Sequence, residues 1–173
     1  MKKINLRLEQ YRDPWIFSKC IEKNVFGFYT REFYALDNFS SFKVKYRGVI
    51  YSTSEHAYQA AKFIESAPEV AEEIINSFSA HDAQRIAHEN KDKICSNWDG
   101  KKLQIMEEIL REKLKQNPYI QKKLLQTEDY TIVEDSPKDS YWGWGSNMDG
   151  YNHLGKLWMK LRQELREEKN NES

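Results

Sequence analysis

The chain has 173 residues, and its 27 lysine and arginine residues balance its 27 aspartate and glutamate residues. This length suits one domain with a sizeable core, and the zero net charge provides no general attraction to DNA, RNA or anionic membranes. No apolar run approaches the roughly 20 residues of a membrane-spanning helix, and the N-terminus has no signal-peptide pattern. We therefore expect a cytoplasmic protein without a membrane partner.

The cysteines and histidines do not form a metal-binding pattern. Cys20 and Cys95 lie in no CxxC or CxxxH motif, so both are expected to be free thiols. His81 and His88 are seven residues apart, but no third ligand has metal spacing. His56 is interpreted as a packed or hydrogen-bonded structural residue. We therefore expect no metal and no cofactor.

The first ordered elements are expected after an N-terminal extension over residues 1–25. Val44 and Tyr46, then Val49 and Tyr51, alternate around an Arg-Gly turn, which predicts a hairpin over residues 43–51. A capping box follows, with Ser52 as the cap and Glu55 at the third helical position, and predicts a helix to about residue 66.

Three further helices are expected next in the chain. Pro68 opens a helix that continues to about residue 78, and a second capping box, Ser79 with Asp82, precedes a helix through about residue 89. Asp99 is expected to cap a long helix that ends near Asn117. Its apolar positions have helical spacing: Leu103, Met106, Leu110 and Leu114.

The C-terminal part is expected to contain a short helix over residues 119–126, a short strand over residues 130–134 and a loop over residues 135–152. The last helix has an apolar face formed by Leu154, Leu157, Trp158, Leu161 and Leu165. We expect Leu103, Met106, Leu110, Leu157 and Leu161 to share one core. The predicted fold is therefore mainly α, a compact single domain over residues 26–168 with a small β-hairpin and a polar tail over residues 169–173. Fraying is expected over residues 167–173.

One helical segment carries an unusual set of polar side chains. Glu55, Gln59 and Lys62 stand at positions i, i+4 and i+7, so an acid, an amide and an amine share a helix face. Neighbouring alanines would allow a ligand to approach closely. The alternative is that Glu55 only completes the capping box and Lys62 is a solvated charge.

A second candidate region is the loop rich in glycine and tryptophan, residues 139–145, followed by residues 150–155. Its glycines permit tight turns and close approach to a ligand, and it leads into the N-terminus of the last helix, where anions can bind. The alternative is a glycine-rich turn with Trp142 and Trp144 folded into the core.

Taken together, the two regions resemble the YbiA/NADAR family, from about Phe26 to Arg166. Ser52, Leu114 and Trp158 depart from the family pattern as changes in packing. The matching residues occur in family order: Phe28-Tyr29, Asn38-Phe39, Tyr51, Glu55-His56, Tyr58-Gln59, Lys62-Phe63, Arg85, Asn97-Trp98, Lys102, Met106, Lys113-Leu114, Thr127, Glu134, Asp139, Trp142-Gly143, Asn152-x-Leu154-Gly155, Met159 and Arg162.

The resemblance implies a mainly helical N-glycosidase that cleaves the bond between ribose C1 and an exocyclic amine. It leaves two substrate classes open: ribosylaminopyrimidine phosphates of riboflavin synthesis, and ADP-ribose attached to guanine, with ADP-ribosylated DNA as a partner. The alternative is a non-catalytic module that binds ADP-ribose, another nucleotide or nucleic acid, for which Lys101-Lys102 and Lys122-Lys123 are candidate contacts. The sequence does not determine the oligomeric state.

The same resemblance places the catalytic residues. Lys62 is the candidate nucleophile that forms a Schiff base with the sugar, which requires burial to lower its pKa. Glu55 is the proton shuttle, and Asp139 is a second acid–base group or a ligand of the ribose hydroxyls. The competing mechanism is direct hydrolysis by Glu55 and Asp139.

The resemblance also implies a set of substrate-binding residues. Tryptophan rings are expected to stack on the base, other side chains to line the sugar pocket, and loop residues to shape it. We expect Glu55, Lys62 and Asp139 to converge on one pocket, with Trp142 on its wall. The substrate-binding residues are Asn38, Phe39, Tyr58, Gln59, Trp98, Trp142, Gly143 and Asn152.

Overall fold

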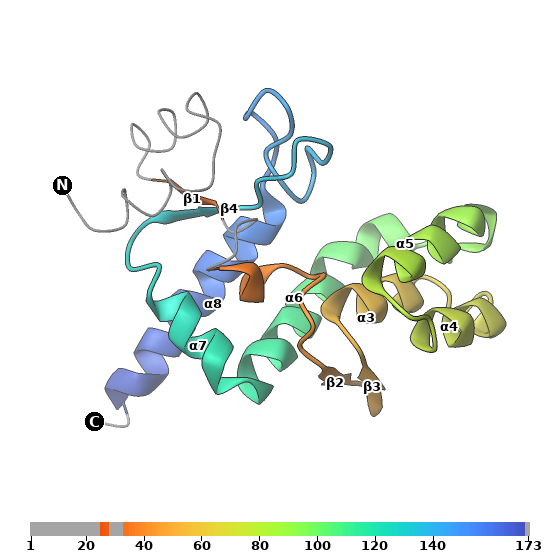
Figure 1. Cartoon of the computed structure of the whole chain (residues 1–173), viewed down its shortest axis with the longest axis horizontal. Coiled ribbons are helices and arrows are strands. Elements are labelled where there is room, and N and C mark those ends of the chain that lie inside the picture. Colours follow the sequence, from red (N-terminus) through yellow and green to blue (C-terminus); the bar gives the residue numbers. More distant parts are fainter. Residues whose placement is uncertain (1–24, 28–32, 172–173) are drawn as a thin grey trace. The chain divides into compact units, whose positions relative to one another are not determined.

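The computed structural model describes residues 25–27 and 33–171; the expected extension before Val25, including Cys20, lies outside this part. The chain divides into two compact units, one formed by Asn38–Lys122 and the other by the segments before and after it. Six α-helices and two two-stranded sheets make up the described residues (Figure 1). The prediction of a mainly α fold with a small β-hairpin is therefore confirmed.

The unit Asn38–Lys122 contains the hairpin and most of the helices. Within it, α3 packs against α4, α5 and α6, while α6 also packs against β2. None of the helices among the described residues is long and apolar enough to cross a bilayer. The elements in chain order are β2 (Val44–Tyr46), β3 (Val49–Tyr51), α3 (Ser54–Ala61), α4 (Pro68–Ile75), α5 (Ala80–Glu89), η2 (Lys91–Lys93), α6 (Trp98–Gln116) and, across the boundary between the units, α7 (Pro118–Leu125).

The hairpin forms as predicted. Strands β2 and β3 pair in antiparallel register, with Val44 opposite Tyr51. The turn residues Arg47 and Gly48 both have positive φ, 48° and 85°, which matches the twist of two-residue hairpin turns. The second strand of the hairpin thus leads into helix α3.

Helix α3 begins differently from the prediction. Its N-cap is Thr53 rather than Ser52: Thr53 is extended, and its hydroxyl accepts the backbone N–H of His56. This hydroxyl satisfies the first-turn donor, so Glu55 is not part of a capping box. The helix also ends at Ala61, short of the predicted residue 66, and turns follow it.

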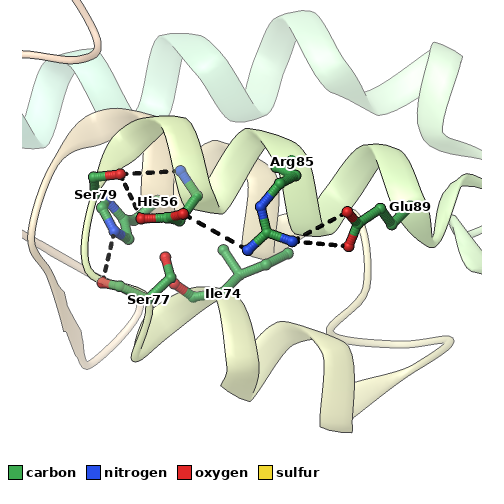
Figure 2. A network of polar contacts seen from close by, with 7 residues as sticks. His56, Ile74, Ser77, Ser79, Arg85 and Glu89 are labelled. Atoms are coloured by element: carbon green, nitrogen blue, oxygen red, sulfur yellow. Dashed lines mark hydrogen bonds and ion pairs between the residues drawn. The ribbon is translucent and has the colours of Figure 1, made fainter.

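Helices α4 and α5 follow the capping signals closely. Pro68 opens α4, which ends at Ile75 rather than at residue 78. Ser79 Oγ accepts the N–H of Asp82 and donates to its carboxylate at 2.6 Å, so the second capping box is confirmed (Figure 2). Helix α5 ends at Glu89, as predicted.

Helix α6 begins at Trp98 with Asn97 as its N-cap, so the prediction that Asp99 caps it is wrong. The Asp99 carboxylate instead accepts from Lys102 one turn later, at 2.7 Å. Leu103 is exposed, contrary to its expected place in the core, whereas Met106 and Leu110 are buried. Leu103 therefore lies off the buried face of α6, which is formed by Trp98, Ile105, Met106, Ile109, Leu110, Lys113 and Leu114.

The other unit is organised around a parallel strand pair that the sequence did not predict. Strand β1 (Val25–Gly27) pairs with β4 (Thr131–Val133), with Phe26 opposite Ile132. Only the strand near residues 130–134 was expected. A short 3-10 turn, η1 (Tyr34–Leu36), completes the N-terminal segment.

Helix α8 (His153–Asn171) buries its predicted apolar face, including Leu157 and Leu161. Trp158 is fully buried and donates its indole N–H to the carbonyl of Leu36 at 2.9 Å. The helix continues to Asn171, so the predicted frayed tail is helical as far as this residue, and residues 167–171 contain no glycine or proline to break it. That the buried leucines of the two units share one core stays a prediction.

Candidate active site

Glu55 and Gln59 form a buried polar pair on helix α3. Both side chains are 5% exposed, and Gln59 Nε2 donates to Glu55 Oε1 at 2.6 Å. The backbone N–H of Glu55 donates to the carbonyl of Asn38 at 3.0 Å. The acid is thus held in place inside the unit, and the interpretation of Glu55 as a helix cap is wrong because Thr53 has that role.

The Lys62 amine lies against two aromatic rings. Lys62 directly follows α3, and its Nζ is 5.1 Å from the centroid of Tyr58 and 5.9 Å from that of Trp98. The two rings are themselves 5.2 Å apart and tilted by 58°. The aromatic walls remove the amine from bulk water, so Lys62 is not the freely solvated charge of the alternative interpretation.

This surrounding shifts the acid–base behaviour of Lys62. Burial lowers the pKa of its amine from the ordinary value of 10.5; the charge of Glu55 acts in the opposite direction, and that of Lys102 lowers the pKa further. The net shift is downward, so a larger fraction of the amine is neutral near neutral pH. A neutral amine is the form that can attack carbon.

Three buried oxygen atoms in this region have no hydrogen-bond partner among the described residues: Asn38 Oδ1, Ser54 Oγ and Gln59 Oε1. Buried polar atoms are nearly always paired, so these oxygens mark places where a ligand can donate hydrogen bonds. Sequence analysis missed Ser54, because in the run Ser52-Thr53-Ser54 only the structure shows which hydroxyl caps the helix.

Phe39 lies in the same unit, against the ring of His81 in helix α5. Their ring centroids are 4.9 Å apart. Among the described residues, no three or more His, Cys, Asp or Glu side chains are grouped so that they could hold a metal ion. Phe39 is therefore supported by α5 through this ring contact.

His56 has a structural role, as predicted. Its ring is fully buried, with Nδ1 2.8 Å from Thr53 Oγ1. Its Nε2 is 3.3 Å from the carbonyl of Ser77 (Figure 2). A backbone carbonyl only accepts, so we assign the proton to Nε2, and the Thr53 hydroxyl donates to Nδ1. This network ties the start of α3 to the turn after α4.

The His56 network predicts acid sensitivity. Burial lowers the pKa of His56 from 6.5, while the hydrogen bond to Ser77 and the charge of Asp82 act upward. Because the unfolded chain then binds the proton more readily, stability is lost as the pH falls from about 6.5 through the folded-state pKa. We expect urea denaturation to give a lower free energy of unfolding at about pH 5.5 than at about pH 7.5. The decrease should be smaller in His56→Gln; an equal decrease in both proteins would contradict this assignment.

In the other unit, Asp139 organises the glycine-rich loop. Its Oδ1 accepts the backbone N–H groups of Tyr141 and Trp142, at 2.8 and 2.7 Å. The carbonyls of those two residues in turn accept from the first amides of α8, on His153 and Leu154. The predicted anion site at this helix N-terminus is therefore wrong, because the loop carbonyls occupy these donors.

Gly143 and Asn152 also shape this loop. A Cβ on Gly143 would lie 2.5 Å from the carbonyl oxygen of Glu134 and 2.9 Å from that of Asp139, so only glycine fits. Asn152 has a positive φ of 51°, and its buried amide bonds the carbonyl of Ile132 and the N–H of Glu134. The side chain of Asn152 thus holds strand β4 against the start of α8.

The two loop tryptophans differ in position. Trp144 is buried, and its indole N–H donates to Asp135 at 2.8 Å. Trp142 is only half-buried and packs edge-on against Tyr141, with ring centroids 5.0 Å apart. Trp142 thus keeps part of its surface accessible. Its convergence with Glu55, Lys62 and Asp139 on one pocket stays a prediction, because the loop and α3 belong to different units.

Comparison with known proteins matches residues 22–166 to the NADAR domain family. N-glycosidase YbiA of Shigella boydii is 34% identical over 151 residues, which cover 86% of this chain and 93% of that protein. The NMR structure of the Escherichia coli protein YbiA superposes with a TM-score of 0.77 at 34% identity, over 85% of this chain and 88% of that one. A riboflavin biosynthesis protein of Vibrio vulnificus is 34% identical over 132 residues, 76% of this chain and 35% of that protein.

Proposed function

Because the chain belongs to the NADAR family, we propose that it is an N-glycosidase that cleaves the bond between ribose C1 and an exocyclic amine. The observation that carries the proposal is the Lys62 amine, which burial makes less basic beside the carboxylate of Glu55. Similarity to proteins named N-glycosidase supports the same reaction class.

The substrate chemistry explains why an amine is useful there. A sugar bonded to an exocyclic nitrogen can open its ring to an imine, which carries an electrophilic C1. Lys62 Nζ then forms a bond to C1, the bond from C1 to the substrate nitrogen breaks, and the amine leaves. Water attacks the lysine imine at C1, which releases the sugar and restores Lys62.

Proton transfers in this sequence need a second group near C1. Glu55 takes the proton that Lys62 loses on attack and delivers it to the leaving nitrogen, and in the second half it deprotonates water. Its hydrogen bond from Gln59, at 2.6 Å, orients the carboxylate for this transfer. Glu55 in α3 and Lys62 directly after it therefore act together.

Asp139 enters the proposal in two alternative ways. As a second acid–base group it would complete a two-carboxylate hydrolysis with Glu55, and as a ligand it would bind the sugar. The two N–H groups that Asp139 Oδ1 accepts favour a positioning role, in which the carboxylate holds the loop that carries Trp142. We therefore propose covalent catalysis by Lys62 over direct hydrolysis.

The substrate is a ribosylaminopyrimidine phosphate or ADP-ribosylated guanine. Similarity to a riboflavin biosynthesis protein supports the first class. Both should be offered to the protein side by side, with the products analysed by mass spectrometry. We expect one of them to yield the free amine and the free sugar phosphate or ADP-ribose; intact substrate in both reactions would contradict the proposal.

Binding of nucleic acid as the main function has no support from the pair Lys101-Lys102. Lys101 forms an ion pair with Glu65 and Lys102 one with Asp99, at 3.0 and 2.7 Å. Thermal-shift measurements with ADP-ribose, ribose 5-phosphate and a DNA oligomer compare these ligand classes directly. Stabilisation by the sugar phosphates is expected; stabilisation by DNA alone would favour the alternative module.

A further inference from the structure

The oxygen atoms without partners around Glu55 have a definite orientation. Asn38 Nδ2 donates to the sulfur of Met106 at 3.4 Å, and Gln59 Nε2 donates to Glu55 Oε1 at 2.6 Å. Rotating the Gln59 amide would place its oxygen against the carboxylate, two acceptors facing each other. Asn38 Oδ1 and Gln59 Oε1 are therefore the atoms that stay unpaired.

Both amide oxygens belong to residues that form hydrogen bonds with Glu55. The carbonyl of Asn38 accepts the Glu55 N–H, and Gln59 holds the Glu55 carboxylate. Ser54, adjacent to Glu55 in the chain, is fully buried and adds a hydroxyl that also lacks a partner. Two acceptors and one hydroxyl without partners thus belong to residues that are hydrogen-bonded to the proposed proton shuttle or adjacent to it in the chain.

A ligand that binds these oxygens must donate hydrogen bonds. A metal cation would also bind oxygen atoms, but the charge of Lys62 acts on Glu55, and Lys102 adds a second positive charge nearby. These charges disfavour a further cation. Neutral hydroxyl groups satisfy the acceptors without repulsion, and a ribose ring presents two of them on adjacent carbons.

We propose that Asn38, Ser54 and Gln59 bind the 2- and 3-hydroxyl groups of the sugar and make the site selective for ribose over deoxyribose. The identity of the sugar rests on the proposed function; the need for hydrogen-bond donors at these residues rests on the unpaired oxygens. A sugar without one hydroxyl leaves a buried acceptor unpaired, and sites that hydrogen-bond a hydroxyl reject analogues without it. We expect at least about tenfold weaker binding for each missing hydroxyl.

Calorimetry on the full chain tests this without turnover. The probes are methyl β-ribofuranoside 5-phosphate and its 2-deoxy and 3-deoxy counterparts, which cannot open to an aldehyde and so cannot react with Lys62. The ribo compound should bind at least about tenfold more tightly than either deoxy compound. Equal affinities, or no binding of the ribo compound, would overturn the proposal.

Two variants connect the preference to these residues. Ser54→Ala and Asn38→Leu should each weaken binding of the ribo compound and leave the affinity for at least one deoxy compound unchanged. A purely structural loss would weaken the binding of all three compounds alike, and this result would count against the proposal. Ser66→Ala is the matched control, because the exposed Ser66 hydroxyl donates to the carbonyl of Lys93. Should Asn38→Leu fail to fold, Ser54→Ala still decides. If the protein selects ribose but cleaves neither substrate, only the N-glycosidase proposal is contradicted. If it cleaves a substrate but does not select ribose, only the present inference is contradicted.

Discussion

Replacing Lys62 by alanine should lower the activity at least about 1000-fold, because the nucleophile is lost. The same loss is expected for Lys62→Arg, since a guanidinium keeps the positive charge but is not deprotonated near neutral pH. Steady-state rates on whichever ribosyl-amine is cleaved provide the measurement. Thermal denaturation should show that both variants fold, because the amine of Lys62 lies beside the Tyr58 and Trp98 rings rather than within the aliphatic core.

The arginine variant separates the two mechanisms. If Lys62→Arg retains substantial turnover, Lys62 acts only as a charge, and direct hydrolysis by Glu55 and Asp139 is the better account. Glu55→Gln should then reduce the rate more than either substitution of Lys62, because an amide cannot transfer protons. Lys101→Ala is a suitable control, since this lysine forms an ion pair with Glu65 at an exposed position and should leave the rate unchanged.

The second large effect concerns stability: Gly155→Ala should lower the free energy of unfolding by about 3 kcal/mol or more. In most helices this change stabilises by up to about 1 kcal/mol. Here a Cβ would collide with the backbone carbonyl of Ile132 and with the side-chain amide of Asn152. The Cβ would lie 2.5 Å from Asn152 Nδ2 and 2.6 Å from Asn152 Oδ1. Strand β4 and the loop would have to shift together, so thermal or urea denaturation should detect the loss.

Gly100→Ala is the matched control for this prediction. Gly100 is also helical, but its added Cβ would meet only the end of the Asn97 side chain, at 2.8 Å, which can rotate away. The control should change stability by less than about 1 kcal/mol. Similar losses in both variants would contradict the account of strand β4 held against α8.

The sequence predicted the local elements well where side-chain signals are strong. Pro68 and the Ser79–Asp82 pair mark helix starts through backbone chemistry that does not depend on the rest of the fold. Where three adjacent hydroxyls competed, at Ser52 to Ser54, spacing alone selected the wrong cap. The parallel pairing of β1 with β4 joins strands about 100 residues apart, and no local pattern specifies such a partner.

The candidate residues of the site could be proposed from the sequence, whereas their surroundings could not. Spacing placed Glu55, Gln59 and Lys62 on one face, and resemblance to a family identified that face among several charged ones. The unpaired oxygens of Ser54 and Asn38 depend on packing, because the sequence does not show which polar atoms remain without a donor. Likewise, the role of Asp139 in holding two loop amides follows only from its backbone surroundings.

Trapping with borohydride during turnover tests the central claim most directly. Reduction of a lysine imine fixes the sugar on the protein as a stable secondary amine, and peptide mass spectrometry locates it. The covalent mechanism predicts a sugar adduct on the peptide that contains Lys62, and no adduct in Lys62→Ala. Continued turnover in borohydride without any adduct, or an adduct on another lysine, would contradict it.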